Sequence, residues 1–284
     1  MARGLVSLLL LLAGMAMTLV AIPSAWIDRD LLDNDRYTDA VAPLIHEPVV
    51  QEQVARALTT PISERLDLSP VLERLLQDAT EKVVATEAFV PVWTDAVRLS
   101  HQSAVEGLRD EGKGVNFVKD GVVVDRKALV EALRPRLAEA GLPFADQIPA
   151  GEGTIVLARG PDVDRAVTIA RVADRWAPEM AVAAVVLLLL SVLVARRRGL
   201  ALTVAGLGVL AVAGLWWWGI GSDRNGLLSA AGDEPVTTTH LLWDALSASL
   251  RDLVRGVAVA GGVTTGLGLV VALLGAVGGR RRPA

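Results

Sequence analysis

The chain has 284 residues, of which 52% are hydrophobic and 21% charged, and its formal net charge is −4. This combination is typical of a membrane protein with a sizeable aqueous domain rather than of a protein buried entirely in lipid. There is no cysteine, which excludes disulfides, thiol catalysis, cysteine-ligated zinc and iron–sulfur clusters. A domain of about 150 residues can bury a core without disulfides, so an extracytoplasmic location is still open.

Four uncharged, largely apolar stretches predict a protein with four transmembrane helices. They are residues 5–22, 180–195, 199–220 and 256–277. None contains an Asp, Glu, Lys, Arg or His. Ion-coupled transport usually needs such side chains at membrane depth, so their absence disfavours a pump or a proton relay.

Seven arginines lie in segments without any acidic residue, at places that a four-span topology assigns to one side. They are Arg3, Arg196, Arg197, Arg198, Arg280, Arg281 and Arg282. Short basic segments stay in the cytoplasm and can pair with anionic lipid headgroups at the inner face of the bilayer. We therefore expect a bacterial plasma-membrane protein with both termini cytoplasmic and with residues 26–178 and 221–255 extracytoplasmic.

This topology divides the chain into six parts. The first apolar stretch exceeds the usual signal-peptide core of about 7–15 residues, and Pro23 spoils the cleavage site, so we expect an uncleaved signal anchor. The expected parts are transmembrane helix 1 (1–25), the extracytoplasmic domain (26–178), helix 2 with its arginine stop (179–198), helix 3 (199–220), an outer loop with an amphipathic helix (221–255), and helix 4 with a basic tail (256–284).

The extracytoplasmic domain reads as an α-rich α+β domain. Asp35 or Thr38 is a candidate N-cap for an early helix, and Ser69-Pro70 predicts the start of a clear amphipathic one. Residues 121–125 and 154–158 are short β-type runs that we expect to pair as a small sheet. The last helix of the domain should run on into the second span, with a break at Pro178. In the outer loop, the amphipathic helix carries a leucine stripe at Leu242, Leu246, Leu250 and Leu253.

Tryptophans and small residues suggest how the spans are anchored and packed. Trp26, Trp176, Trp216, Trp217 and Trp218 stand at the outer ends of spans, as interfacial anchors do; an aromatic cage for a ligand is the alternative for the Trp triplet. Ala258, Gly262 and Gly266 form a small-residue seam on the fourth span. Such a seam lets helices approach closely, either within the four-helix bundle or between two copies of the chain in a homo-oligomer.

No pattern of catalytic or cofactor-binding residues is present. The three histidines (His46, His101, His240) are isolated in the sequence, so a zinc site built on two of them is disfavoured. The acidic cluster Asp28, Asp30, Asp33 and Asp35 lacks the spacing of a calcium loop. We therefore expect no cofactor and no enzymatic activity. We also expect no nucleic-acid partner, since the segments predicted to lie outside the membrane are acidic.

The segments LLDNDRYTDAVAPLIHEPVVQEQVARAL and GVVVDRKALVEALRPRLAEAGLPFADQIP, with the arginine-rich exit from the second span, resemble a family of uncharacterised actinobacterial integral membrane proteins. The resemblance covers roughly residues 20–220. It implies an N-terminal span, a large extracytoplasmic α-rich domain and further C-terminal spans, and it assigns no reaction. Two functions remain open: an envelope protein whose outer domain binds another envelope protein or lipid, and an accessory or permeation subunit of a transport system. A membrane-bound hydrolase is a third, less favoured reading.

Overall fold

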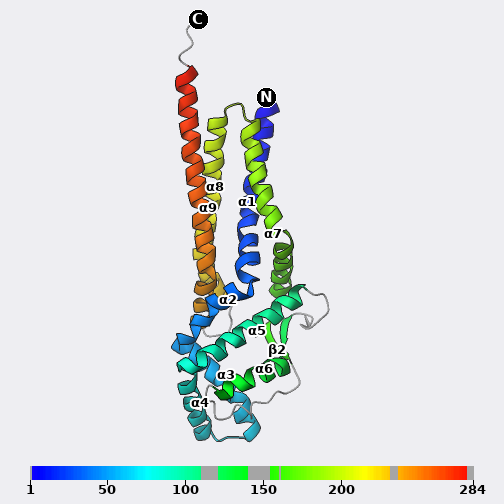
Figure 1. The fold of residues 1–284 in the computed structure, drawn as a ribbon, viewed down its shortest axis with the longest axis vertical. Helices are drawn as coiled ribbons and strands as arrows, with labels where there is room; N and C mark the ends of the chain where they lie inside the picture. The colour runs from blue at the N-terminus through cyan, green and yellow to red at the C-terminus, as the bar shows by residue number, and fades with distance from the viewer. Residues whose placement is uncertain (1, 110–120, 140–153, 160, 231–235, 280–284) are drawn as a thin grey trace. The chain divides into compact units, whose positions relative to one another are not determined.

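We describe the fold from a computed structural model, which covers residues 2–109, 121–139, 154–159, 161–230 and 236–279. The described residues are mostly helical (Figure 1). Nine α-helices are described: α1 (Ala2–Trp26), α2 (Asn34–Val41), α3 (Pro48–Leu66), α4 (Pro70–Val84), α5 (Val90–Arg109), α6 (Arg126–Glu139), α7 (Pro161–Val194), α8 (Arg198–Ala230) and α9 (Val236–Gly279). Short helical turns lie at Ile27–Leu31, Ala42–His46 and Glu87–Phe89, and two strands are β1 (Gly121–Asp125) and β2 (Thr154–Arg159).

The chain forms two compact units. One unit, which we call the bundle, comprises residues 1–30, 172–232 and 247–284; the other, which we call the domain, comprises residues 31–171 and 233–246. The division separates the long apolar helices from the amphipathic ones. It also assigns the first turns of α9, part of the predicted outer loop, to the domain.

Among the described residues, four helices are long and apolar enough to cross a membrane. Their candidate spans are Arg3–Leu31, Arg165–Val194, Arg198–Ser222 and His240–Ala276. Each contains most or all of one predicted stretch, so the prediction of four candidate spans is confirmed at this level. In the bundle the first turn of α1, the turn between α7 and α8, and the last turn of α9 lie at the same end (Figure 1).

Two helices are longer than the sequence patterns indicate. The last helix of the domain does run on into the second span, as predicted, but α7 is continuous over 34 residues with Pro178 inside it, so the predicted break is absent. The amphipathic segment before the fourth span and the span itself are one helix, α9, of 44 residues. Neither helix is interrupted by a charged or polar turn, because polar residues on one face do not end a helix.

The domain has a hydrophobic core built from α3, α4, α5 and α6 and from the short helical turns Ala42–His46 and Glu87–Phe89. Its deepest side chains include Ile45, Val84 and Phe89, and Leu137 of α6 packs with them. Leu241, from the first turns of α9, packs against the same core. The neighbouring Leu242 of the predicted leucine stripe is 36% exposed. The segment before the fourth span therefore contributes Leu241 to the domain core, and Leu241 lies next to the predicted leucine stripe.

Strands β1 and β2 pair antiparallel, with Gly121 opposite Arg159 and Asp125 opposite Thr154, and with an irregularity between Val122 and Val123. This is the pairing that we expected for these two runs. A two-stranded ribbon has no face that could carry a core by itself. All other described elements of the domain are helices, so the description as a helical domain with one ribbon replaces the α-rich α+β class.

The helix starts agree with the sequence in one case and differ in another. Ser69 is the N-cap of α4 and Pro70 its first residue, as predicted. The N-cap of α2 is Asp33, whose carboxylate accepts a hydrogen bond of 2.9 Å from the Arg36 backbone N–H. The prediction of Asp35 or Thr38 is therefore wrong. The helix begins earlier, and the buried Thr38 instead donates to the Asn34 carbonyl within it.

Candidate functional site

Exposed positive charge gathers at one end of the bundle. Arg196 and Arg197 lie in the turn between α7 and α8, and Arg198 is the first residue of α8. Arg3 belongs to the first turn of α1 and is also exposed. Within the described part of the chain, none of these four guanidinium groups has an ion-pair partner. The other predicted topology residues, Arg280, Arg281 and Arg282, lie outside the described residues.

Trp216 has a specific hydrogen-bonding role inside the bundle. Its indole N–H donates to the Leu19 carbonyl of α1 over 3.0 Å. In an α-helix this carbonyl would accept from the residue four positions later, which is Pro23 and has no N–H. A carbonyl without a donor is costly in lipid, where no water replaces the lost bond. Trp216 therefore supplies the donor that Pro23 lacks.

The other predicted anchors fall into two groups. Trp26 is buried, and its indole N–H donates to Ser249 Oγ over 3.0 Å, so it ties α1 to α9. Trp176, Trp217 and Trp218 are exposed, as interfacial anchors are. The Arg255 guanidinium lies 5.3 Å from the centre of the Trp217 ring. The cation that faces this tryptophan therefore belongs to the chain itself, and the structure gives no support for a ligand cage.

The close approach between α8 and α9 uses the helix face beside the predicted seam. A Cβ atom added at Gly206 would lie 2.7 Å from the Gly261 carbonyl oxygen, and one at Gly199 would lie 2.5 Å from the Ala272 nitrogen. A Cβ atom at Gly262 or Gly266 would meet no atom within 4 Å. Ala258 is partly buried. Packing in the bundle therefore depends on Gly261 and its neighbours, and leaves Gly262 and Gly266 uncovered.

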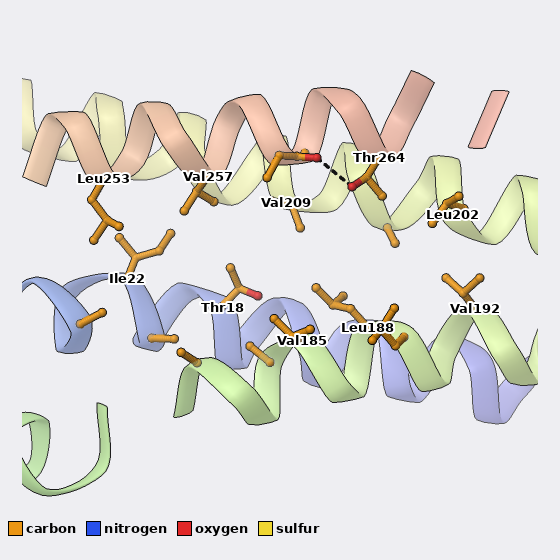
Figure 2. Close-up of a pocket in the computed structure, with 18 residues that line it drawn as sticks. Thr18, Ile22, Val185, Leu188, Val192, Leu202, Val209, Leu253, Val257 and Thr264 are labelled. Atoms are coloured by element: carbon orange, nitrogen blue, oxygen red, sulfur yellow. Dashed lines mark hydrogen bonds between the residues drawn. The ribbon is translucent and has the colours of Figure 1, made fainter. Parts of the chain in front are cut away.

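A cavity of about 380 Å³ lies among the four bundle helices. Figure 2 shows Thr18 and Ile22 of α1 with Val185, Leu188 and Val192 of α7 on one side, and residues of α8 and α9 on the other. The lining includes two hydroxyls, and both donate within their own helix: Thr18 to Gly14 over 2.8 Å and Thr264 to Ala260 over 2.7 Å. Because no donor or charge is left for a guest, this cavity suits only an apolar group.

A partly buried polar cluster lies in the domain, where α2 meets α5. The His101 ring stacks on Tyr37 with ring centres 3.9 Å apart. Its Nε2 lies 2.9 Å from the Leu31 carbonyl and its Nδ1 lies 3.0 Å from Asn34 Oδ1. Since a carbonyl only accepts, Nε2 carries a hydrogen and donates. When His101 Nδ1 carries a hydrogen, it donates to Asn34 Oδ1. When Nδ1 carries none, it accepts from the Asn34 NH₂ group, which a half-turn of the amide brings to the same place.

Burial sets the protonation of this cluster. It lowers the pKa of His101, against smaller raising effects of the hydrogen bond to the Leu31 carbonyl and of the Asp33 carboxylate. Burial also raises the pKa of the Tyr37 phenol. Both shifts favour neutral side chains at neutral pH. The cluster is a packed, neutral joint between α2 and α5 and carries no nucleophile.

The described residues contain no group of three His, Asp or Glu side chains that could hold a metal ion. Asp33 and Asp35, from the acidic cluster, serve the local structure: Asp33 caps α2, and the Asp35 carboxylate lies 3.5 Å from the Arg98 guanidinium. His101 is held by Leu31 and Asn34 rather than by a carboxylate.

The domain exposes an apolar patch at the turn that joins α3 to α4. Leu66 is the last residue of α3, and Val71, Leu72 and Leu75 lie in the first two turns of α4. Their exposed fractions are 51%, 69%, 52% and 59%. The sequence places the last three in an amphipathic stripe. In the structure Thr80 and Val84 of α4 are buried and Leu76 and Val83 pack against the core, whereas Val71, Leu72 and Leu75 at the start of the helix are exposed.

No family model, curated protein or solved structure matches this chain. The function has to be argued from the surfaces themselves. Sequence reasoning missed the cavity, the cluster at His101 and the exposure of the patch, since each depends on which helices become neighbours. The pairing of Pro23 with a distant tryptophan had a visible signal, a proline inside an apolar helix.

Proposed function

We propose that this chain is a non-enzymatic, multi-pass protein of the cell envelope, in which the bundle is a membrane anchor and the domain binds another envelope protein. The observation that carries the proposal is the exposed patch of Leu66, Val71, Leu72 and Leu75. Four large apolar side chains close together in the sequence, each at least half exposed, are unusual on a domain that has a well-packed core elsewhere.

The charges around the patch favour a protein partner over a lipid surface. The exposed charged residues that flank it are Glu64, Arg65, Asp67, Glu73, Arg74 and Asp78. Their sum is negative, and an anionic bilayer would be repelled by it. Val71, Leu72 and Leu75 form a ridge along the first two turns of α4, and such a ridge fits between the side chains of an apolar helix. We therefore propose a partner that presents an apolar helical face.

The four candidate spans support the anchoring role. The common location of Arg196–198 and the first turn of α1 at one end of the bundle supports a cytoplasmic assignment for that end. Residues 26–178 and 221–255 would then be extracytoplasmic. A transport subunit receives no comparable support, because the cavity among the helices is lined by apolar groups and by two hydroxyls that bond within their own helices.

Site-directed crosslinking in living cells tests the partner. A photoreactive residue at position 71 should form an adduct with one envelope protein, and the Leu72→Gln/Leu75→Gln double variant should abolish that adduct. These side chains are half exposed, so the double variant should still fold. Two matched controls are available: the photoreactive residue at Ala57, an exposed position on α3, and the Leu99→Gln variant, whose exposed leucine belongs to α5 and not to the patch.

Equal adducts at positions 71 and 57, or an adduct that survives the double variant, would contradict the proposal. The topology is tested separately with a reporter enzyme fused after Arg198. We expect this reporter to lie in the cytoplasm and to act only on a substrate there. Reporter activity outside the cell would reverse the assignment of the arginine-rich end to the cytoplasm.

A further inference from the structure

We propose that the pocket at the basic end of the bundle binds one anionic phospholipid. The pocket has a volume of about 330 Å³. It is formed by the first turns of α1, the last turn of α7, the turn that follows it and the start of α8. All of these segments belong to the bundle. The inference goes beyond the proposed function, since it concerns the bundle and does not depend on a partner of the domain.

One end of the pocket is positively charged. Arg196 and Arg197 line it, both are exposed, and neither has an ion-pair partner among the described residues. The pocket also borders the start of α8, where the first intrahelical hydrogen bond is donated by the Ala201 N–H to the Arg197 carbonyl over 3.0 Å. The backbone N–H groups before Ala201 therefore have no carbonyl acceptor in α8 itself. Two guanidinium groups and these N–H groups together suit a phosphodiester.

Most of the remaining lining of the pocket is apolar. Leu8 and Leu11 of α1 and Leu200 and Val204 of α8 line it. Leu8, Leu200 and Val204 are each more than two-fifths exposed, so they would contact lipid in a membrane. An inorganic or free organic phosphate would leave this wall uncovered, whereas an acyl chain attached to the phosphate would cover it. The combination selects a phospholipid over a soluble anion.

The two serines of the pocket add no donor for the headgroup. Ser7 Oγ donates to the Ser191 carbonyl over 2.8 Å, and Ser191 Oγ donates to the Leu188 carbonyl over 2.7 Å. The Ser7 hydrogen joins α1 to α7, and the Ser191 hydrogen is used within α7. Recognition of the negative charge therefore depends on Arg196 and Arg197, which predicts a preference for anionic over zwitterionic lipids.

Native mass spectrometry of the full chain tests the proposal. The chain is released from micelles that contain equal amounts of phosphatidylglycerol and phosphatidylcholine. We expect one phosphatidylglycerol molecule to be retained preferentially. The Arg196→Gln/Arg197→Gln variant should weaken that preference about 30-fold, because each arginine near a lipid surface contributes about fivefold. Arg197→Gln should weaken it more than Arg198→Gln, which removes the same charge from a neighbouring residue that does not line the pocket.

A second pair of variants tests the apolar wall. A Cβ atom at Gly4 or at Gly214 meets no atom within 4 Å, and only Gly4 lines the pocket. Gly4→Phe should therefore reduce lipid retention by filling the pocket, and Gly214→Phe should not. Equal retention of both lipids, equal effects of Arg197→Gln and Arg198→Gln, or displacement by millimolar glycerol phosphate, which would indicate a site for a soluble anion only, would each overturn the proposal.

Discussion

In the domain the deepest side chains are large and aliphatic or aromatic, whereas in the bundle the closest contacts between helices are made by glycine. Ile45, Val84 and Phe89 fill the domain core. In the bundle, Gly206 lies against the backbone of Gly261, and a Cβ atom at Gly14 would be 2.8 Å from Leu188. In water, apolar burial drives packing. In lipid it does not, because the acyl chains are as apolar as the side chains, and helices associate through close contact and hydrogen bonds instead.

The threonine hydroxyls behave alike in the two units. In the bundle, Thr18, Thr203 and Thr264 donate to carbonyls of their own helices, as Thr80 and Thr94 do in the domain. Helices are joined by other side chains, by His101 and Asn34 in the domain and by Ser7, Trp26 and Trp216 in the bundle.

The largest effect that we expect comes from the domain core. Phe89→Ala should destabilise the domain by about 3–5 kcal/mol, because it removes a side chain that is 2% exposed and leaves a cavity. Hydrogen exchange of the full chain in detergent should show faster exchange in α3, α4 and α5. Leu72→Ala, at a half-exposed position, is the control and should change exchange little. Equal effects of the two variants would mean that the core is not organised around Phe89.

A smaller loss of stability is expected from removing the hydrogen bond between the Trp216 indole and the Leu19 carbonyl. Trp216→Phe should destabilise the bundle by about 1–2 kcal/mol, since it leaves the Leu19 carbonyl without the indole donor. In a Pro23→Ala background the new backbone N–H can donate to that carbonyl, so the same substitution should cost less. Unfolding by denaturing detergent measures this double-mutant cycle. Trp218→Phe, at a mostly exposed tryptophan, is the control, and a cycle without coupling would refute the link between Pro23 and Trp216.

The smallest effect is a dependence of domain stability on pH. The folded pKa of His101 is lowered by burial, so the unfolded chain binds more protons. Stability should therefore be unaffected well above the unfolded pKa of about 6.5 and should decrease as the pH falls through it. Thermal unfolding at pH 8 and pH 5 measures the change, and His101→Gln should reduce the slope. A transition that is more stable at pH 5 would show that the sign is wrong.

The sequence alone was sufficient for features that depend on local composition. Four apolar stretches predicted four candidate spans, and Ser69 with Pro70 predicted the start of α4, because hydropathy and capping act over a few residues. Helices in the domain and the pairing of the two short β-type runs were also expected. The length of α9 was not, since the leucine stripe and the span that follows it suggested two separate helices.

Only the tertiary structure decided which faces of these helices are used. On α9 the residues Gly261 and Gly262 are equally small, and only the position of α8 selects Gly261 for close contact. Likewise, Trp216 could be read as an interfacial anchor until Leu19 and Pro23 were found opposite it. A helix that is apolar on every side has no amphipathic pattern to mark its packed face, and in lipid that face is chosen by shape and hydrogen bonding between residues far apart in the chain.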